Sequence, residues 1–323
     1  MTGDPTVIYI AGSGRSGSTL LERTLGEMQG FVNVGELIDL FRRVAPRGER
    51  CGCGREFASC PFWARVGAEA FGGWDPRQLT AAHLLQDRVA RQRHLLQLAA
   101  VRLAGQGFRD ALRTYGDTYS RLYRAIATIA GADYVIDASK WPAQVLALSR
   151  AGLKVRVIHL IRDVRGVAHS LGKTDVGRPQ AVQAADVMWH VRPASAAARW
   201  VACQSEADLL KYCGLRVTRM RYEDFVRQPK RSVQSAFAAL GVPADPVHLA
   251  HIGGQRITLG ASHGLSGNPS RFQAGEVSLH ADESWRVQMS RRDRAIVTAI
   301  GLPQLIHHGA GRASLPTSQP GLR

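Results

Sequence analysis

A glycine-rich turn near the start of the chain restricts the possible folds more than any other feature. Residues 12–19 read GSGRSGST, between the apolar run at residues 7–11 and the helical pattern at residues 20–25. Glycines let the backbone turn tightly, so that its N–H groups and the N-terminus of the following helix point toward an anion. The pattern predicts a phosphate-binding loop between a strand and a helix, although an ordinary strand-to-helix turn is the alternative.

The loop differs from the nucleoside-triphosphate P-loop, Gly-x4-Gly-Lys-Ser/Thr, at one decisive position. Ser18 stands where that motif has the lysine that reaches the β- and γ-phosphates. Arg15 is the only basic residue of the loop. We therefore expect a different phosphate-bearing ligand, held by Gly14, Arg15, Ser16, Gly17, Ser18 and Thr19.

Five short apolar or β-branched segments are predicted as buried strands, separated by helical patterns. This alternation predicts one α/β domain with a central parallel sheet flanked by helices, a P-loop-NTPase-like topology and helical insertions. Ligands of such sheets bind at the carboxyl ends of the strands. The predicted strands are residues 7–11, 31–34, 134–136, 155–161 and 215–220.

The chain has 323 residues, which suits one large domain, here expected over residues 1–308. Helical insertions are expected at about residues 75–131 and 173–200, and the first can serve as a lid or an acceptor-binding insertion. Residues 309–323 are rich in Gly, Ser and Pro, and we expect a disordered tail there. Oligomeric state is left open.

The net charge of +16 favours polyanionic ligands, although it also fits a solvated, arginine-rich surface. No basic block with interleaved aromatic residues is present, so nucleic acid is not an expected partner. No apolar run is long enough to span a membrane, which leaves only peripheral membrane contact. The absence of a signal-peptide pattern and the odd count of five cysteines favour a reducing cytoplasm.

A second anion site is predicted at residues 157–170, VIHLIRDVRGVAHS. An apolar strand ends in Arg162 and Asp163, and a helix begins. Arginine binds phosphate with two parallel hydrogen bonds, so Arg162 and Ser170 are candidates for a second phosphate. The alternatives are an ion pair between Arg162 and Asp163, or Asp163 as a helix cap.

Together the two sites resemble the sulfotransferases that use 3′-phosphoadenosine 5′-phosphosulfate (PAPS). In that family the glycine loop holds the 5′-phosphosulfate, and the Arg-Asp strand end, with a serine eight residues after the arginine, holds the 3′-phosphate. Residues 136–140, IDASK, and 221–225, RYEDF, resemble further family segments, the second bringing Tyr222 near the nucleotide. Residues 266–272, SGNPSRF, resemble a loop that closes over the nucleotide and contributes Ser266, Gly267, Asn268 and Arg271.

The resemblance implies transfer of a sulfuryl group from PAPS to a hydroxyl or amine, leaving adenosine 3′,5′-bisphosphate and requiring no metal. The acceptor is expected to be a small molecule such as a secondary metabolite, a glycolipid or a carbohydrate. Glu36, which follows the second strand in a Gly-Glu pair, is the candidate base. Lys140 and Arg15 are the candidates for stabilising the leaving phosphate. His83, His94 and His190 remain alternative bases.

Two other function classes remain as rivals. A small-molecule kinase of the P-loop type would require ATP and magnesium, and Ser18 argues against it. A non-catalytic polyanion-binding protein would show steep salt dependence without nucleotide preference, and the paired phosphate motifs argue against it.

Cys51, Cys53 and Cys60 suggest a zinc site only in part. Zinc sites usually have four ligands and Cys-x2–4-Cys spacing, whereas the first pair here is Cys-x-Cys. No fourth ligand is evident nearby apart from His83. The sequence therefore favours free buried thiols or a local structural knuckle, and no metal ligand is predicted.

Overall fold

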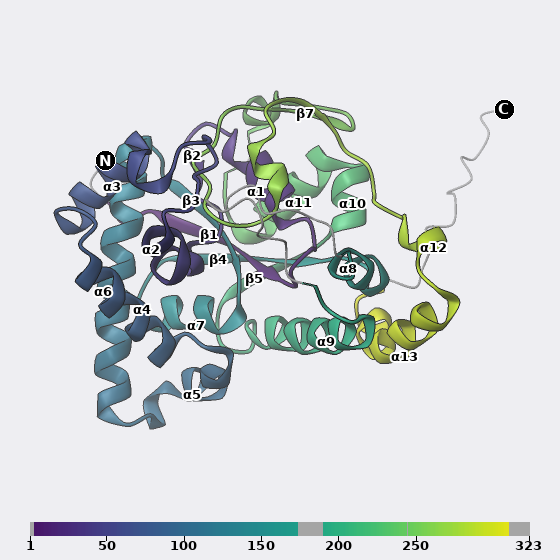
Figure 1. The fold of residues 1–323 in the computed structure, drawn as a ribbon, viewed down its shortest axis with the longest axis horizontal. Coiled ribbons are helices and arrows are strands. Elements are labelled where there is room, and N and C mark those ends of the chain that lie inside the picture. Colours follow the sequence, from purple (N-terminus) through teal and green to yellow (C-terminus); the bar gives the residue numbers. More distant parts are fainter. Residues whose placement is uncertain (1–2, 174–189, 244, 310–323) are drawn as a thin grey trace.

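The computed structural model describes residues 3–173, 190–243 and 245–309. A central sheet of five strands, all parallel, has the order β2-β3-β1-β4-β5 (Figure 1). The predicted α/β architecture is confirmed, and the third strand extends beyond its predicted end at residue 136. The strands are β1 (Thr6–Gly12), β2 (Phe31–Asn33), β3 (Tyr134–Lys140), β4 (Val155–Ile161) and β5 (Arg216–Arg221).

The central strand β1 is buried along its whole length because both faces of the sheet are covered, whereas the edge strand β5 carries three arginines. Successive side chains of a strand point to opposite faces. In β1, Val7 and Tyr9 enter one hydrophobic core, whereas Ile8 and Ile10 enter another. The core of the protein is thus divided by the sheet into two layers.

One face of the sheet carries most of the first half of the chain. The 25-residue helix α6 buries the ring stripe Tyr115, Tyr119 and Tyr123, whose spacing of four places them on one helix face. The helical stretch predicted at residues 75–131 is therefore helical, and its longest helix belongs to the core. The helices on this side are α2 (Ala45–Arg47), α3 (Pro61–Phe71), α4 (Pro76–Val89), α5 (Leu95–Ala99), α6 (Gln106–Ala130), α7 (Pro142–Arg150) and α9 (Pro193–Leu209).

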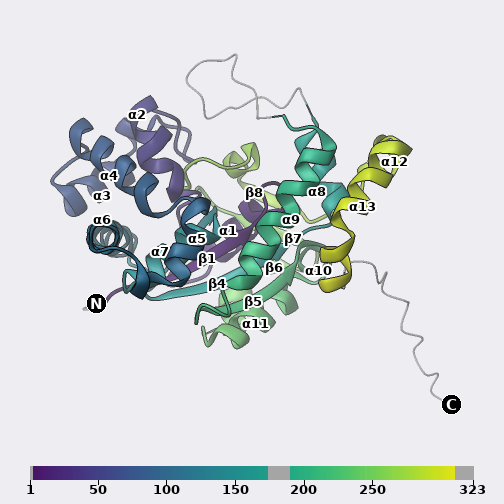
Figure 2. The ribbon, with the colours of Figure 1, turned by 90° about the horizontal axis from the view of Figure 1, so that it is seen from below.

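The opposite face is covered by α1 (Ser18–Gly26) and α11 (Pro229–Leu240), which lie above the sheet in Figure 1. A third apolar cluster joins α8 (Val164–Leu171), α9 and α13 (Arg291–His307), and Figure 2 shows these three helices next to one another. These remaining helices are α1 (Ser18–Gly26), α8 (Val164–Leu171), α10 (Tyr222–Arg227), α11 (Pro229–Leu240), α12 (Trp285–Gln288) and α13 (Arg291–His307).

A small antiparallel sheet, absent from the predicted elements, lies next to α1. It contains β6 (Ile252–Gly253), β7 (Arg256–Leu259) and β8 (Gly275–Ser278). The loop between β7 and β8 returns to the central sheet, where Leu265 pairs with Gly35. A Cβ on Gly35 would lie 2.1 Å from the carbonyl oxygen of Leu265, so only glycine allows this approach.

Two predicted segments fall mainly outside the described residues. These are residues 174–189 of the second insertion and residues 310–323 of the tail. Among the helices that the structure does describe, none has the length and apolar character needed to cross a membrane.

Candidate active site

A cavity of 640 Å³ lies at the carboxyl end of the central sheet. Its walls come from the last residue of β3, from the segments that follow β1, β2, β4 and β5, and from the segment between β7 and the residues just after β8. All but two of the predicted site residues line it. Those lining it are Gly14, Arg15, Gly17, Ser18, Thr19, Glu36, Lys140, Arg162, Ser170, Tyr222, Ser266, Gly267 and Asn268.

The two exceptions are Ser16 and Arg271, and both are buried. The Ser16 hydroxyl has no hydrogen-bond partner in the described part of the protein. Arg271 lies beneath the loop and donates hydrogen bonds to the carbonyl oxygens of Gly264 (3.2 Å) and Ser266 (2.6 Å). The expected contact of Arg271 with a nucleotide is thus not supported, because its guanidinium holds the loop from behind.

The glycine loop leaves backbone donors facing the cavity. Gly17 has a φ of 89°, and a Cβ there would lie 2.4 Å from the Tyr222 ring. Within the described residues, no side chain caps the N-terminus of α1, so the N–H groups of its first turn lack the usual acceptor. Together with the helix dipole, these groups form a site suited to an anion.

Backbone strain gathers at the same cavity. Arg15, Lys140 and Ser266 have φ values of 65°, 71° and 57°, and they are the non-glycine residues with positive φ in the described chain. Each such conformation costs about 1–3 kcal/mol and persists only where the surroundings impose it. All three residues line the cavity.

The two charged residues that follow β4, Arg162 and Asp163, have different roles. Asp163 caps α8 by accepting the N–H of Arg165 at 2.8 Å, and its carboxylate pairs with the Arg165 side chain. The alternative of a cap is therefore correct for Asp163. Arg162 instead donates to the carbonyl oxygen of Arg15 at 2.9 Å and lies 4.8 Å from the centre of the Tyr222 ring. Its second amino group contacts Asp282 at 3.3 Å.

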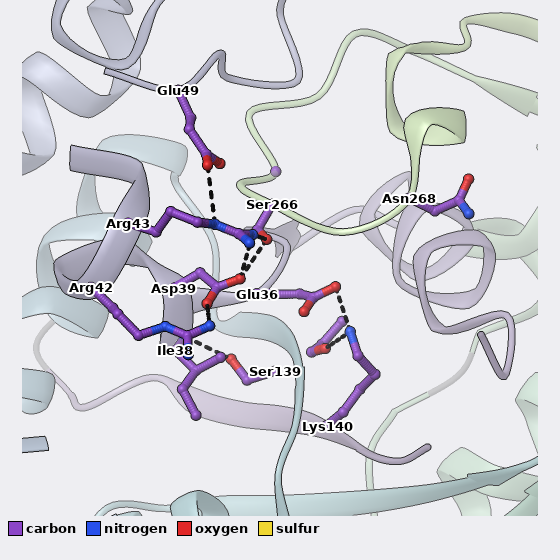
Figure 3. Close-up of polar contacts among 12 residues, drawn as sticks. Glu36, Ile38, Asp39, Arg42, Arg43, Glu49, Ser139, Lys140, Ser266 and Asn268 are labelled. Atoms are coloured by element: carbon purple, nitrogen blue, oxygen red, sulfur yellow. Dashed lines mark hydrogen bonds and ion pairs between the residues drawn. The ribbon is translucent and has the colours of Figure 1, made fainter. Parts of the chain in front are cut away.

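Glu36 and Lys140 point toward one another in the cavity and form an ion pair (Figure 3). Lys140 also donates to the carbonyl oxygen of Ala138 at 3.2 Å. The Glu36 N–H donates to the Leu265 carbonyl oxygen at 2.8 Å, so the loop between β7 and β8 fixes its backbone. The candidate base, Glu36, and a candidate for stabilising the leaving phosphate, Lys140, are thus adjacent.

A polar network that the sequence analysis missed ties the loop to the segment after β2. The Ser266 hydroxyl donates to Asp39 at 2.6 Å, and Arg43 pairs with Asp39 at 2.7 Å and with Glu49 at 3.1 Å (Figure 3). Burial opposes ionisation of Asp39, but Arg43 and Arg42 prevail and lower its pKa. One signal in the sequence could have identified Asp39. It lies three residues after Glu36, and residues three apart lie on the same side of a helical segment.

Two further carboxyl groups lie behind the cavity, fully buried. Burial, reinforced by the charge of Glu36, raises the pKa of Glu22 to about 8. Burial also raises the pKa of Asp137 to about 6, although Asp137 accepts hydrogen bonds from the Ser139 N–H (2.9 Å) and the Tyr123 hydroxyl (2.6 Å). The sequence analysis assigned neither residue to the site.

The alternative histidine bases do not line the cavity. His83 lies 3.9 Å from the carboxylate of Asp87, and His94 lies 3.2 Å from Gln97. His190 is exposed at the edge of the described residues. His280, which was not predicted, does line the cavity, and its carbonyl oxygen accepts the Tyr222 hydroxyl at 3.2 Å.

Away from this cavity, the structure adds a fourth residue to the three cysteines. His263 lies against Cys51, Cys53 and Cys60, with their side-chain N and S atoms all within 4.8 Å of one another. His83, the ligand considered from the sequence, is not part of this group.

The chain is similar to one family of known proteins. Residues 5–246 match the model of a family described as the sulfotransferase family. No curated protein matches the sequence. Among solved structures, the sulfotransferase domain of the olefin synthase from Synechococcus PCC 7002 is 18% identical, with a TM-score of 0.50 and 96% of each chain covered.

Two other structures are similar to a lesser degree. The sulfotransferase domain from the curacin biosynthetic pathway is 17% identical, with a TM-score of 0.46 over 93% of this chain and 97% of that one. A sulfotransferase from Mycobacterium avium is 11% identical, with a TM-score of 0.48 over 95% of this chain and 77% of that one.

Proposed function

This chain belongs to the sulfotransferase family, and we propose that it transfers a sulfuryl group from PAPS to a hydroxyl or amine of an acceptor. The acceptor class that we propose is a small molecule such as a secondary metabolite, a glycolipid or a carbohydrate. One observation carries the proposal. The two anion motifs, after β1 and β4, share a single 640 Å³ cavity with the Glu36–Lys140 pair.

The residues around the cavity fit a donor with separated anionic groups. The uncapped N-terminus of α1, Arg15 and the hydroxyls of Ser18 and Thr19 suit the 5′-phosphosulfate. Arg162 and Ser170 suit the 3′-phosphate. A serine in place of the P-loop lysine agrees with a donor that has no β- and γ-phosphates. For the same reason we propose that transfer needs no magnesium.

The donor, once bound, supplies a sulfuryl group whose S–O bond to the 5′-phosphate breaks as the acceptor oxygen or nitrogen bonds to sulfur. Glu36 accepts the proton that the acceptor loses. Lys140 and Arg15 stabilise the negative charge that develops on the leaving phosphate. Catalysis then depends mainly on orientation and charge stabilisation, as in phosphoryl transfer.

We also propose a cytoplasmic location. All five cysteines are free, which agrees with the reducing cytoplasm that we propose. The net charge of +16 is compatible with an anionic or lipid-borne acceptor at a membrane surface.

Isothermal titration calorimetry with adenosine 3′,5′-bisphosphate and with ATP, each with and without magnesium, tests the donor. We expect tight binding of the bisphosphate that does not depend on magnesium. Preference for magnesium-ATP would indicate a kinase and refute the proposal. Steeply salt-dependent binding of any polyanion, without preference for the bisphosphate, would indicate the non-catalytic alternative.

A further inference from the structure

Three thiols and one imidazole converge on a single point beside the loop between β7 and β8. The Cys60 Sγ lies 3.6 Å from that of Cys51 and 3.7 Å from that of Cys53. The Nδ1 of His263 lies 3.3 Å from the Cys60 Sγ and 3.6 Å from the Cys51 Sγ. Residues 51–60 and residue 263 are far apart in the sequence, so the fold alone brings these atoms together.

Four of the six separations among these atoms match the edges of a zinc coordination tetrahedron, and the other two are within 4.8 Å. Zinc binds thiolate at about 2.3 Å and imidazole at about 2.0–2.1 Å, which puts tetrahedral ligand atoms about 3.8 Å (S to S) or 3.6 Å (S to N) apart. The four observed distances lie close to these values. A disulfide does not explain them, because bonded sulfurs are about 2.05 Å apart and the five cysteines are free.

The backbone holds the cysteine segment in this arrangement. The Cys51 N–H donates to the Arg55 carbonyl oxygen at 2.8 Å, and the Gly54 N–H donates to that of Cys51 at 2.9 Å. Cys60 is the N-cap of α3, so its position is fixed where that helix begins. These turns explain how a Cys-x-Cys pair, an unusual spacing, presents both sulfurs to the same side.

The histidine segment is fixed just as firmly. The Trp63 indole donates to the His263 carbonyl oxygen at 2.9 Å, and the Phe62 ring stacks on the imidazole with centroids 4.7 Å apart. The Gly52 N–H donates to the carbonyl oxygen of Gly264 at 3.0 Å. Hydrogen bonds therefore join the two ligand-bearing segments on both sides of the cluster, as in a prepared site.

We propose that Cys51, Cys53, Cys60 and His263 bind one structural zinc ion. Four protein ligands complete the tetrahedron and leave no open position for a substrate, so the ion has no catalytic role. It fastens residues 51–60 to the loop that begins at β7. Ser266, Gly267 and Asn268 of the same loop line the cavity, so the ion stabilises one wall of it. This inference does not depend on the proposed reaction.

Metal analysis of the full chain tests the site directly. The protein is produced in zinc-supplemented medium with a tag that contains no histidine, and metals are measured by inductively coupled plasma mass spectrometry. We expect one zinc ion per chain, and exchange for cobalt(II) should give the visible absorption of a tetrahedral cobalt–thiolate site. Folded protein holding less than about a tenth of an equivalent of zinc would overturn the proposal. A disulfide among the three cysteines, detected by mass spectrometry, would overturn it as well.

Matched cysteine variants locate the ion. Cys53→Ser should lower the zinc content at least about tenfold, because one of four ligands is lost. Cys213→Ser changes a thiol outside the cluster and should retain the full zinc content. Equal zinc content in both variants would refute the assignment. Should Cys53→Ser fail to fold, the zinc content and cobalt spectrum of the unchanged chain still decide the question.

Discussion

Lys140 and Glu36 form an ion pair although Lys140 is the last residue of β3 and Glu36 follows β2, the neighbouring strand in the sheet. Their side chains are only 13% and 16% exposed, so the pair is largely shielded from water. Lys140 reaches this position from a strained backbone with φ of 71°. The arrangement brings a proton acceptor and a cation to one side of the cavity, and each can be tested separately.

Glu36→Gln should retain binding of adenosine 3′,5′-bisphosphate and lose sulfuryl transfer by about 10²–10⁴-fold in kcat, the usual contribution of a general base. The amide is similar in shape but cannot accept the acceptor proton. Glu69→Gln, an exposed position on α3, is the matched control and should transfer normally. Calorimetry and a product assay check both variants, and unchanged turnover would remove Glu36 as the base.

Lys140→Met should lower kcat by about 10²–10³-fold, because a cation that stabilises the developing charge is removed. Methionine is nearly as long as lysine and bears the same cost for a positive φ, but it leaves the Glu36 carboxylate without its ionic partner, so the thermal midpoint should fall. Single-turnover rates separate this effect from product release. A rise in KM alone, with kcat retained, would show that Lys140 contributes to binding only.

Ser170→Ala should weaken binding of adenosine 3′,5′-bisphosphate while leaving binding of adenosine 5′-monophosphate unchanged. A hydrogen bond to a charged group contributes about 1.5–3 kcal/mol, which corresponds to roughly 10–150-fold in Kd. The monophosphate lacks the 3′-phosphate and therefore serves as the internal control. Equal loss for both ligands would contradict a 3′-phosphate site at Ser170.

Glu22 should make the protein less stable as the pH rises. Its pKa is about 8 in the folded state, compared with an ordinary value of 4.5, so the folded state holds the proton more tightly. Stability from this group is greatest below pH 4.5 and declines until about pH 8, in total by several kcal/mol at about 1.4 kcal/mol per unit.

Glu22→Gln isolates this effect, because the amide cannot ionise. The variant should be more stable than the unchanged chain near about pH 9 and similar to it near about pH 5, as measured by urea unfolding. Asp137 titrates in both proteins, so the difference reports Glu22 together with its repulsion from the Asp137 carboxylate. A constant difference across this pH range would contradict the raised pKa of Glu22.

Much of the cavity could be predicted from local sequence because its parts are short motifs at strand ends. Arg15 lies inside a glycine loop, and Ser170 lies two turns into a helix that begins at a strand end. The rule that ligands bind at the carboxyl edge of a parallel sheet then predicts that these motifs meet. The same rule predicts that Glu36 and Lys140 lie at the same edge of the sheet.

The features that were missed depend on contacts across long stretches of chain. His263 joins the cysteines only because Leu265 pairs with Gly35 and carries the loop back to the sheet. Arg271 lies within a recognisable motif, but the direction of its guanidinium depends on which carbonyl groups need a donor. Glu22 has the sequence pattern of an ordinary helix residue, and only the packing of α1 buries it.

The left-handed backbone at Arg15, Lys140 and Ser266 has a consequence for engineering this chain. Glycine adopts such conformations without steric cost, so a glycine at any of the three would relax the backbone. Selection for thermal stability alone would thus favour glycine at these positions. Each such substitution would remove a cation or a hydroxyl from the cavity. Stabilising substitutions should accordingly be sought elsewhere, for example on the solvent-facing side of α6, where such a conflict does not arise.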